Sequence, residues 1–179
     1  MIRSLAWLVA MAVYATPNVA AAENNPATRL SLQGLPGVGL VVGKIAPDAS
    51  RDGLTEERLR KQTTARLRTA GIPALSADQQ RRTPRRPALH VNVATSRLET
   101  DEYLYSIHVE LVQWVALLEN GQKAIGAATP VPARTWSAPN AFGIVPADQL
   151  RRHVEKAVAT MLGEFVRAWH QANPRVPPD

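Results

Sequence analysis

The sequence contains no cysteine in its 179 residues. Disulfide bonds and cysteine nucleophiles are therefore excluded, and we expect the stability of the folded chain to come from packing. A bacterial lipoprotein carries its lipid on a cysteine that directly follows the signal peptide, so we also expect no anchor of that kind. The length is that of one domain with an adequate hydrophobic core.

Nucleotide-binding and serine-hydrolase motifs are also absent. The glycine cluster at 34–43 lacks the P-loop spacing, because Val38 stands where the first glycine should precede Lys44 and Ile45 replaces the Ser or Thr. The dinucleotide fingerprint is incomplete as well, since position 42 is not a glycine. No serine lies in a Gly-x-Ser-x-Gly motif. We therefore expect no nucleotide site and no cofactor, and we expect these glycines to relax turns around the first strand.

Long hydrophobic runs are absent after the first 22 residues, where a secretory signal peptide is predicted. Arg3 precedes an apolar run over 5–15, and the alanines at 20–22 form a small-residue cleavage site. The apolar run is about 11 residues long, whereas a membrane span needs about 20, which favours cleavage over an uncleaved anchor helix. We predict cleavage after Ala22 or nearby and a soluble mature protein that is periplasmic or secreted.

Acidic side chains are outnumbered by basic ones. The chain has 21 Lys and Arg against 15 Asp and Glu, and loss of Arg3 with the signal peptide leaves a net charge of about +5. For an exported protein, the anionic partners are phospholipid head groups, lipopolysaccharide phosphates or other acidic envelope polymers, and not nucleic acid. Charge of this size also serves solubility alone, which is the interpretation that we favour.

A single domain is expected over 35–173, after a flexible leader over 23–34 and before a disordered tail over 174–179. Apolar runs, period-two alternation and turn residues predict its strands. These are a buried strand at 38–45, a short one at 72–75, and an antiparallel series at 89–98, 103–118 and within 124–136. Prolines at 130 and 132 make the last strand an edge or an interrupted strand.

Capping residues predict two amphipathic helices. Thr55 begins the first helix, which Gly71 closes, and Pro146 begins the second, which stops before Pro174. An apolar stripe of the second helix ends at Trp169, which we expect in the core. Turns and loops are expected at 47–53, 79–87, 99–102, 120–121 and 137–145.

Together these elements predict an α+β fold. We expect a two-layer sandwich, in which two amphipathic helices cover one face of a mostly antiparallel sheet of four or five strands. The strand at 38–45, followed by a helix and another strand, allows a parallel pair with a right-handed crossover.

The order of the elements resembles that of a group of envelope domains. A helix ends within LRTAGIPAL at 67–75, paired strands follow, and the terminal helix contains LRRHVEKAV at 150–158. This layout resembles the N-terminal domain of the periplasmic protein TolB, and the LpoB and CsgG envelope modules, over most of 35–173. The resemblance implies an envelope interaction domain and transfers no functional residue. The chain departs from TolB in lacking its propeller, and from LpoB and CsgG in lacking their lipid-anchoring cysteine.

The hairpin strands carry the best polar constellation of the chain. Alternation places His90, Asn92, His108 and Glu110 on one face. A register in which the numbers of paired residues add up to 200 brings His90 opposite Glu110 and Asn92 opposite His108. Two imidazoles and one carboxylate match the protein ligands of a catalytic zinc ion. The simpler interpretation is that a solvent-facing sheet surface requires polar residues, because no His-Glu-x-x-His motif supports a metal.

Two further features predict contacts with a partner. The first is the proline-stiffened loop with Arg81, Arg82, Arg85 and Arg86, which could hold phosphates or carboxylates, although charged loops are commonly just solvated. The second is a set of apolar side chains outside the predicted core. They are Val112 and Trp114 on the polar face of their strand, which either a loop or a partner covers, and Trp136 beside a loop, for which we favour packing against its own domain.

These observations favour a non-enzymatic, soluble periplasmic binding or adaptor module for an envelope protein or an anionic envelope polymer. The alternative is a metal-dependent hydrolase that uses His90, His108 and Glu110. Neither the partner nor the oligomeric state follows from the sequence.

Overall fold

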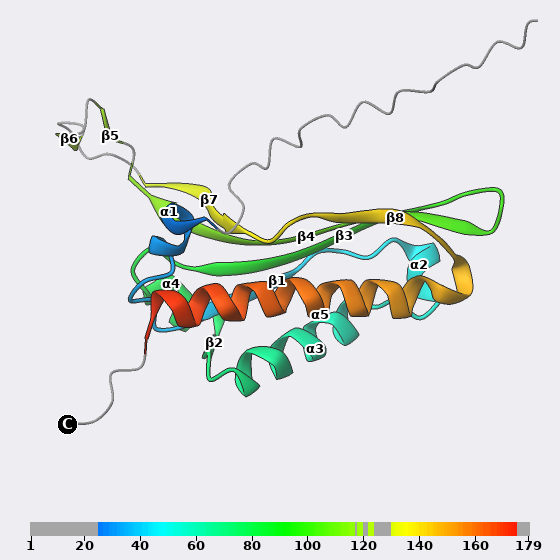
Figure 1. Cartoon of the computed structure of the whole chain (residues 1–179), viewed down its shortest axis with the longest axis horizontal. Coiled ribbons are helices and arrows are strands. Elements are labelled where there is room, and N and C mark those ends of the chain that lie inside the picture. The colour runs from blue at the N-terminus through cyan, green and yellow to red at the C-terminus, as the bar shows by residue number, and fades with distance from the viewer. Residues whose placement is uncertain (1–24, 117, 120–121, 124–129, 175–179) are drawn as a thin grey trace, which may run out of the picture.

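The computed structural model describes residues 25–116, 118–119, 122–123 and 130–174 (Figure 1). The predicted signal peptide over 1–22, the predicted turn at 120–121 and all but Pro174 of the predicted tail lie outside these residues. Among the described helices, none has the length and apolar character needed to cross a membrane.

A mixed sheet forms one layer of the fold. Its strand β1 (Val38–Val42) lies between β2 (Ala74–Leu75) and β3 (Ala88–Arg97) and runs parallel to both. The parallel pairing that 38–45 allowed is thus present. Strand β3 pairs antiparallel with the long β4 (Glu102–Val115), as the alternation predicted.

The other edge of β4 is shared by two strands in succession. Strand β7 (Val131–Ser137) pairs antiparallel with one end of β4, and β8 (Ala141–Pro146) pairs antiparallel with the other end. The sheet therefore has six strands, more than the four or five predicted. Strands β5 (Leu118–Glu119) and β6 (Gln122–Lys123) form a separate antiparallel pair that flanks the predicted turn.

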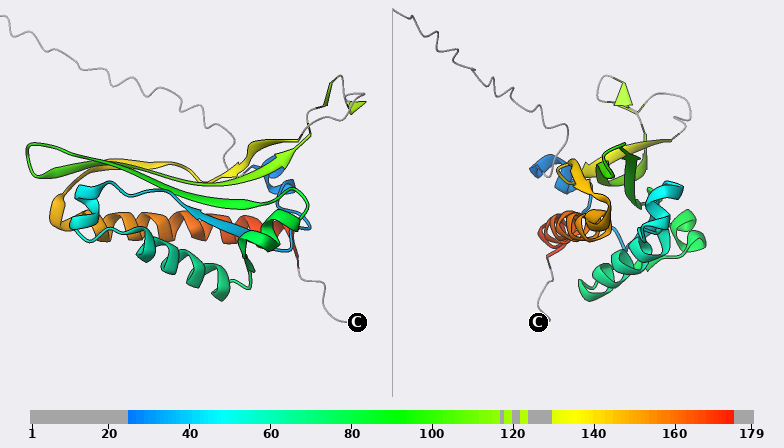
Figure 2. Two further views of the ribbon diagram at one scale, coloured as in Figure 1. Left: turned by 180° about the vertical axis from the view of Figure 1, so that it is seen from behind. Right: turned by 90° about the vertical axis from the view of Figure 1, so that its right-hand side faces the viewer.

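Two helices form the second layer. Helices α3 (Glu56–Thr69) and α5 (Ala147–Ala172) lie side by side on one face of the sheet, and α5 runs along β4 and β8 (Figure 2). The predicted α+β class is confirmed. Three shorter helices lie at the ends of the molecule, namely α1 (Pro26–Leu30), α2 (Pro47–Arg51) and α4 (Ala77–Arg82) (Figure 1).

The long helices begin and end close to where their caps predicted. The Thr55 hydroxyl accepts a 3.3 Å hydrogen bond from the Arg58 N–H, and Gly71 after α3 has a left-handed φ of 70°. Pro146 is the N-cap residue of α5, one position before the place that was predicted. The apolar stripe of α5 faces the sheet and includes Trp169, so the prediction that Trp169 belongs to the core is confirmed.

The register of β3 and β4 agrees with the prediction. Val91 lies opposite Val109, and both are fully buried under α3 and α5. His90 lies opposite Glu110, and Asn92 lies opposite His108. These polar residues occupy the other face of the sheet, because successive side chains of a strand alternate between faces.

Four predicted irregular segments contain regular structure. The leader predicted at 23–34 is helical from Pro26, because Asn25 accepts a hydrogen bond from the Thr28 N–H and Leu32 is fully buried. The loop predicted at 137–145 contains most of β8, whose Val145 is buried although Gly143 interrupts the apolar run. Short helices also replace parts of the loops predicted at 47–53 and 79–87, and Ser76 caps the second of them.

Candidate functional site

The outer face of the sheet, opposite α3 and α5, is the surface on which the predicted site residues meet. Along β4 it presents the even-numbered residues, because the odd-numbered Ile107, Val109 and Leu111 are buried against the helices. Within the described part of the chain, no helix lies over β4 and β8 on this side of the sheet (Figure 2). Near β1 the face is covered by α4, whose Gln80 side chain packs against Gly39.

The middle of the outer face is polar. The carboxylate of Glu110 lies opposite His90 and forms a 3.5 Å ion pair with Arg134 of β7. Burial lowers the pKa of His90, and the nearby negative charge of Glu110 opposes part of that shift. His90 is therefore held toward its neutral form beside an already paired carboxylate.

The His108 side chain forms hydrogen bonds with residues other than the predicted metal ligands. Its Nε2 lies 3.0 Å from the Ser106 hydroxyl, and its Nδ1 lies 2.9 Å from Oδ1 of Asn140. Both ring nitrogens are thus occupied by neutral groups. Although the predicted register is correct, no three His, Asp or Glu side chains among the described residues are grouped to hold a metal. The zinc site predicted at His90, His108 and Glu110 has no support in the geometry, because the register fixes strand partners but not the direction of each side chain.

The Val112–Trp114 surface and the arginine loop lie next to each other at one end of the outer face. The Arg86 guanidinium lies over the Trp114 ring, 5.0 Å from its centroid, and Trp114 remains 38% exposed. The main-chain N–H of Trp114 donates a 2.8 Å hydrogen bond to the main-chain carbonyl of Arg85. This bond attaches the loop to β4. We call Arg86, Val112 and Trp114 the Trp114 corner.

The four loop arginines do not converge on one point. Arg85 donates to the carbonyl oxygens of Ser31 at 3.1 Å and Gln33 at 2.8 Å, so it is engaged within the fold. Arg81 forms an ion pair with Asp78 on α4. Arg82, in the last turn of α4, is exposed. Arg85, whose backbone adopts a left-handed φ of 64°, thus serves the fold itself, and the anion contact of the loop arginines stays a prediction.

Trp136 is a core residue and not a surface residue. It lies in β7 opposite Leu111, is fully buried, and packs edge-to-face against Phe165 with 5.1 Å between ring centroids. The interpretation that Trp136 packs against its own domain is confirmed, and the fully buried ring offers no surface to a partner. The assignment of 137–145 to a loop suggested that Trp136 stood at a surface turn, whereas β8 continues the sheet and α5 covers the ring.

The sequence reasoning missed an apolar area at the opposite end of the outer face. Phe142 is 76% exposed and Ile144 is 57% exposed on β8, and Leu104 lies opposite Ile144 on β4 and is 47% exposed. The alternation of 141–145 was a signal for it, because Val145 faces the core while Phe142 and Ile144 face outward.

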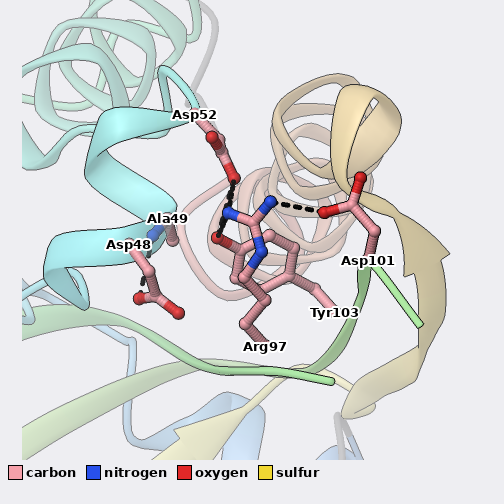
Figure 3. Close-up of polar contacts among 6 residues, drawn as sticks. All are labelled: Asp48, Ala49, Asp52, Arg97, Asp101 and Tyr103. Carbon is pink, nitrogen blue, oxygen red and sulfur yellow. Dashed lines mark hydrogen bonds and ion pairs between the residues drawn. The ribbon is translucent and has the colours of Figure 1, made fainter. Parts of the chain in front are cut away.

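A second missed cluster joins α2 to the tip of the β3–β4 hairpin (Figure 3). Oδ2 of Asp52 accepts hydrogen bonds from the Tyr103 hydroxyl at 2.7 Å and from Nη1 of Arg97 at 3.0 Å. The other guanidinium nitrogen of Arg97 pairs with Asp101, a hairpin residue with a φ of 61°. Hydrogen bonding to Asp101 is the main cause that raises the pKa of Arg97. The arrangement is an internally paired network that fixes the hairpin.

No protein-family model and no curated protein matches the sequence. The resemblance to the TolB, LpoB and CsgG envelope domains therefore stays a prediction that rests on the order of the elements.

Proposed function

We propose that the chain is an exported, non-enzymatic binding module of the cell envelope, and that the Trp114 corner contacts its partner. The observation that carries the proposal is the Arg86–Trp114 pair on a sheet face that no described helix covers there. A guanidinium stacked on an indole keeps N–H donors free at its rim, and the ring contributes apolar contact area. This pairing suits a partner that presents carboxylates or phosphates beside an apolar surface.

The charge around the corner favours an anionic partner. Arg82 and Arg86 are exposed on the loop side, and Arg134 lies on β7 opposite Val112. The nearby carboxylate of Glu110 is already paired with Arg134. With a net charge of about +5 after loss of Arg3, the exposed Arg82 and Arg86 attract acidic envelope polymers or acidic protein surfaces, whereas Arg134 and Glu110 compensate each other.

Binding of the purified protein to phosphatidylglycerol vesicles and to lipopolysaccharide tests whether the partner is an anionic lipid or polymer of the envelope. We expect Arg86→Gln and Trp114→Ala each to weaken binding by about five- to tenfold, because the first removes a charged donor to the partner and the second removes the apolar contact area of the ring, each worth roughly 1 kcal/mol. Arg68→Gln is the matched control, since it removes one exposed charge from α3 on the other side of the sheet.

Site-specific photocrosslinking in intact cells tests whether the partner is a protein. A benzophenone side chain at position 114 should give discrete protein adducts, whereas the same group at position 68 should not. The proposal is contradicted if the corner variants bind both polymers as the Arg68→Gln control does and position 114 gives no adduct.

A further inference from the structure

The outer edge of β8 carries unpaired main-chain groups. Within the described part of the chain, β8 pairs with β4 alone. The Ala147 N–H donates to the Asp101 carbonyl at 3.1 Å, one step beyond the last registered pair of the two strands. Because bonded and non-bonded pairs alternate along an antiparallel ladder, the odd-numbered residues of β8 bond with β4. Phe142 and Ile144 therefore direct their N–H and C=O groups away from the sheet.

This edge lacks the features that keep other strands from adding to a sheet. Natural edge strands are protected by charged side chains, internal prolines, bulges or a covering element. No charged residue occurs in 138–147, and the proline of β8, Pro146, is its last residue, beyond Phe142 and Ile144. The two residues with outward main-chain groups are also the exposed apolar ones, Phe142 and Ile144. Aromatic and β-branched residues favour strand pairing.

We propose that β8 pairs antiparallel with β8 of a second copy of this chain, so that two sheets join into one. A two-fold axis at Gly143 places Phe142 opposite Ile144 of the second copy. Both residues have outward main-chain groups, so this register satisfies four hydrogen bonds without moving β8 on β4. On the outer face the Phe142 ring then packs against Ile144 of the second copy, and Leu104 extends the contact.

Charge favours a second copy at this edge. Most surfaces of two identical basic chains repel each other, but β8 is uncharged along its whole length. Helical spacing places 153, 157 and 160 on the flank of α5 that also carries Gln171. Gln171 accepts a hydrogen bond from Arg29 of α1, which packs on β7, so this flank lies on the β7–β8 side. Its residues at 153, 157 and 160 are His, Ala and Thr, and Arg167 further along the same flank is paired with Glu164, so two α5 helices can approach there without opposing unpaired Lys or Arg side chains.

The paired edges are short, so the dimer should be weak. Stable interfaces bury about 1,200–2,000 Å², and two six-residue strands bury less than that. We expect a dissociation constant on the order of 10–100 µM. The monomer should therefore prevail in dilute solution, and the dimer should prevail at high local concentration.

Sedimentation equilibrium of the purified protein from about 5 to about 500 µM, which extends beyond both ends of that range, tests the proposal. Ile144→Pro removes the outward N–H of the edge and leaves every β4 hydrogen bond in place, so it should weaken dimerisation at least tenfold. Ile144→Lys should do the same by adding charge. Val41→Lys is the matched control, because Val41 is a 40% exposed β-branched residue on the outer face of β1.

A fourth variant separates edge pairing from stacking of two outer faces. Leu104→Lys adds a charge to the same apolar area but on β4, so it should leave edge pairing within about threefold and abolish face stacking. Circular dichroism melting verifies that each variant is folded. The proposal is overturned if the wild type stays monomeric throughout the range, if Val41→Lys weakens the dimer as much as Ile144→Lys, or if Leu104→Lys alone abolishes it.

This inference is independent of the proposed function. Trp114 lies at the opposite end of β4 from Leu104. Ile144→Pro should lose dimerisation and keep polymer binding, and Trp114→Ala should do the reverse, so the two variants test the two proposals separately.

Discussion

The Tyr103 hydroxyl donates a 2.7 Å hydrogen bond to Oδ2 of Asp52, and this contact fastens α2 to the start of β4 (Figure 3). Tyr103 is fully buried, and burial is the main cause that raises its pKa, followed by the hydrogen bond to Asp52. The phenol is thus held in its neutral, donating form. Arg97 contacts the same carboxylate and lies 5.4 Å from the centroid of the Tyr103 ring.

Removing either partner should destabilise the fold by different amounts. We expect Tyr103→Phe to lower the free energy of unfolding by about 1 kcal/mol, the net value of one hydrogen bond. Asp52→Ala should cost about 2–3 kcal/mol, because it leaves a buried phenol without its acceptor and removes one ion pair of Arg97. Urea unfolding of both single variants and the double variant measures the coupling, which should be about 1 kcal/mol. Additive effects would show that the two groups do not interact.

This network shows where sequence reasoning stops. The alternation of β4 predicts that Tyr103 faces inward, in register with the buried Val109 and Leu111. It contains no information on the acceptor, because Asp52 lies 51 residues away on a helix that was predicted to be a loop. Side-chain partners across elements depend on how the layers dock, whereas strand register depends on local patterns.

Trp136 should be essential for stability. It is fully buried against Phe165, and its Nε1 has no hydrogen-bond partner among the described residues. We expect Trp136→Ala to cost about 3–5 kcal/mol and Trp136→Phe clearly less, since the smaller ring keeps part of the packing and no hydrogen bond is lost. Thermal unfolding checks the order of the two variants. Wild-type stability in Trp136→Ala would contradict the core assignment.

Arg85 and Arg86 should differ sharply although they are neighbours. Arg85 holds the carbonyl oxygens of Ser31 and Gln33, so Arg85→Gln should lower the free energy of unfolding by about 1–3 kcal/mol. Arg86→Gln removes a partly exposed contact with Trp114 and should change stability by no more than about 1 kcal/mol. Urea unfolding of both variants, which lose the same charge, is the comparison. Equal losses would mean that the loop is not attached through Arg85.

Gly37 allows the main chain to pass close to Pro73, whereas the sequence predicted only that the glycines relax turns. A Cβ at this position would lie 2.5 Å from the Pro73 carbonyl oxygen and 2.9 Å from its Cβ. Gly37→Ala must therefore displace the backbone before β2, and we expect a loss of about 1–3 kcal/mol, typical of overpacking. Gly34→Ala is an informative comparison, because it meets no atom within 4 Å and is disfavoured only by its φ of 68°. A neutral Gly37→Ala variant in urea unfolding would contradict the contact.

On the outer face, the strand register was predicted correctly, but the side-chain partners were not. The pairing of His90 with Glu110 and of Asn92 with His108 followed from alternation alone. The metal hypothesis built on it found no site, because Asn140, from a segment predicted to be a loop, binds His108. The same segment contains β8 and its exposed Phe142. One glycine and two prolines in 137–146 led to the prediction of a loop. That prediction left out both strand β8 and the hydrogen bond between Asn140 and His108.

His90 should make the stability of the protein depend on pH in mildly acidic solution. Burial holds its pKa in the folded chain below 6.5, the value of an unperturbed histidine, despite Glu110. Below pH 6.5 the unfolded chain therefore binds more protons at this site than the folded chain does, and stability falls as the pH falls. His90→Gln does not titrate, so the stability difference between wild type and variant should shrink from pH 7.5 to pH 5.5. Urea unfolding at both values, with an NMR titration of His90, measures it. Glu110→Gln removes the opposing charge and should lower the titration midpoint further, whereas a midpoint above 6.5 in the wild type would refute the assignment.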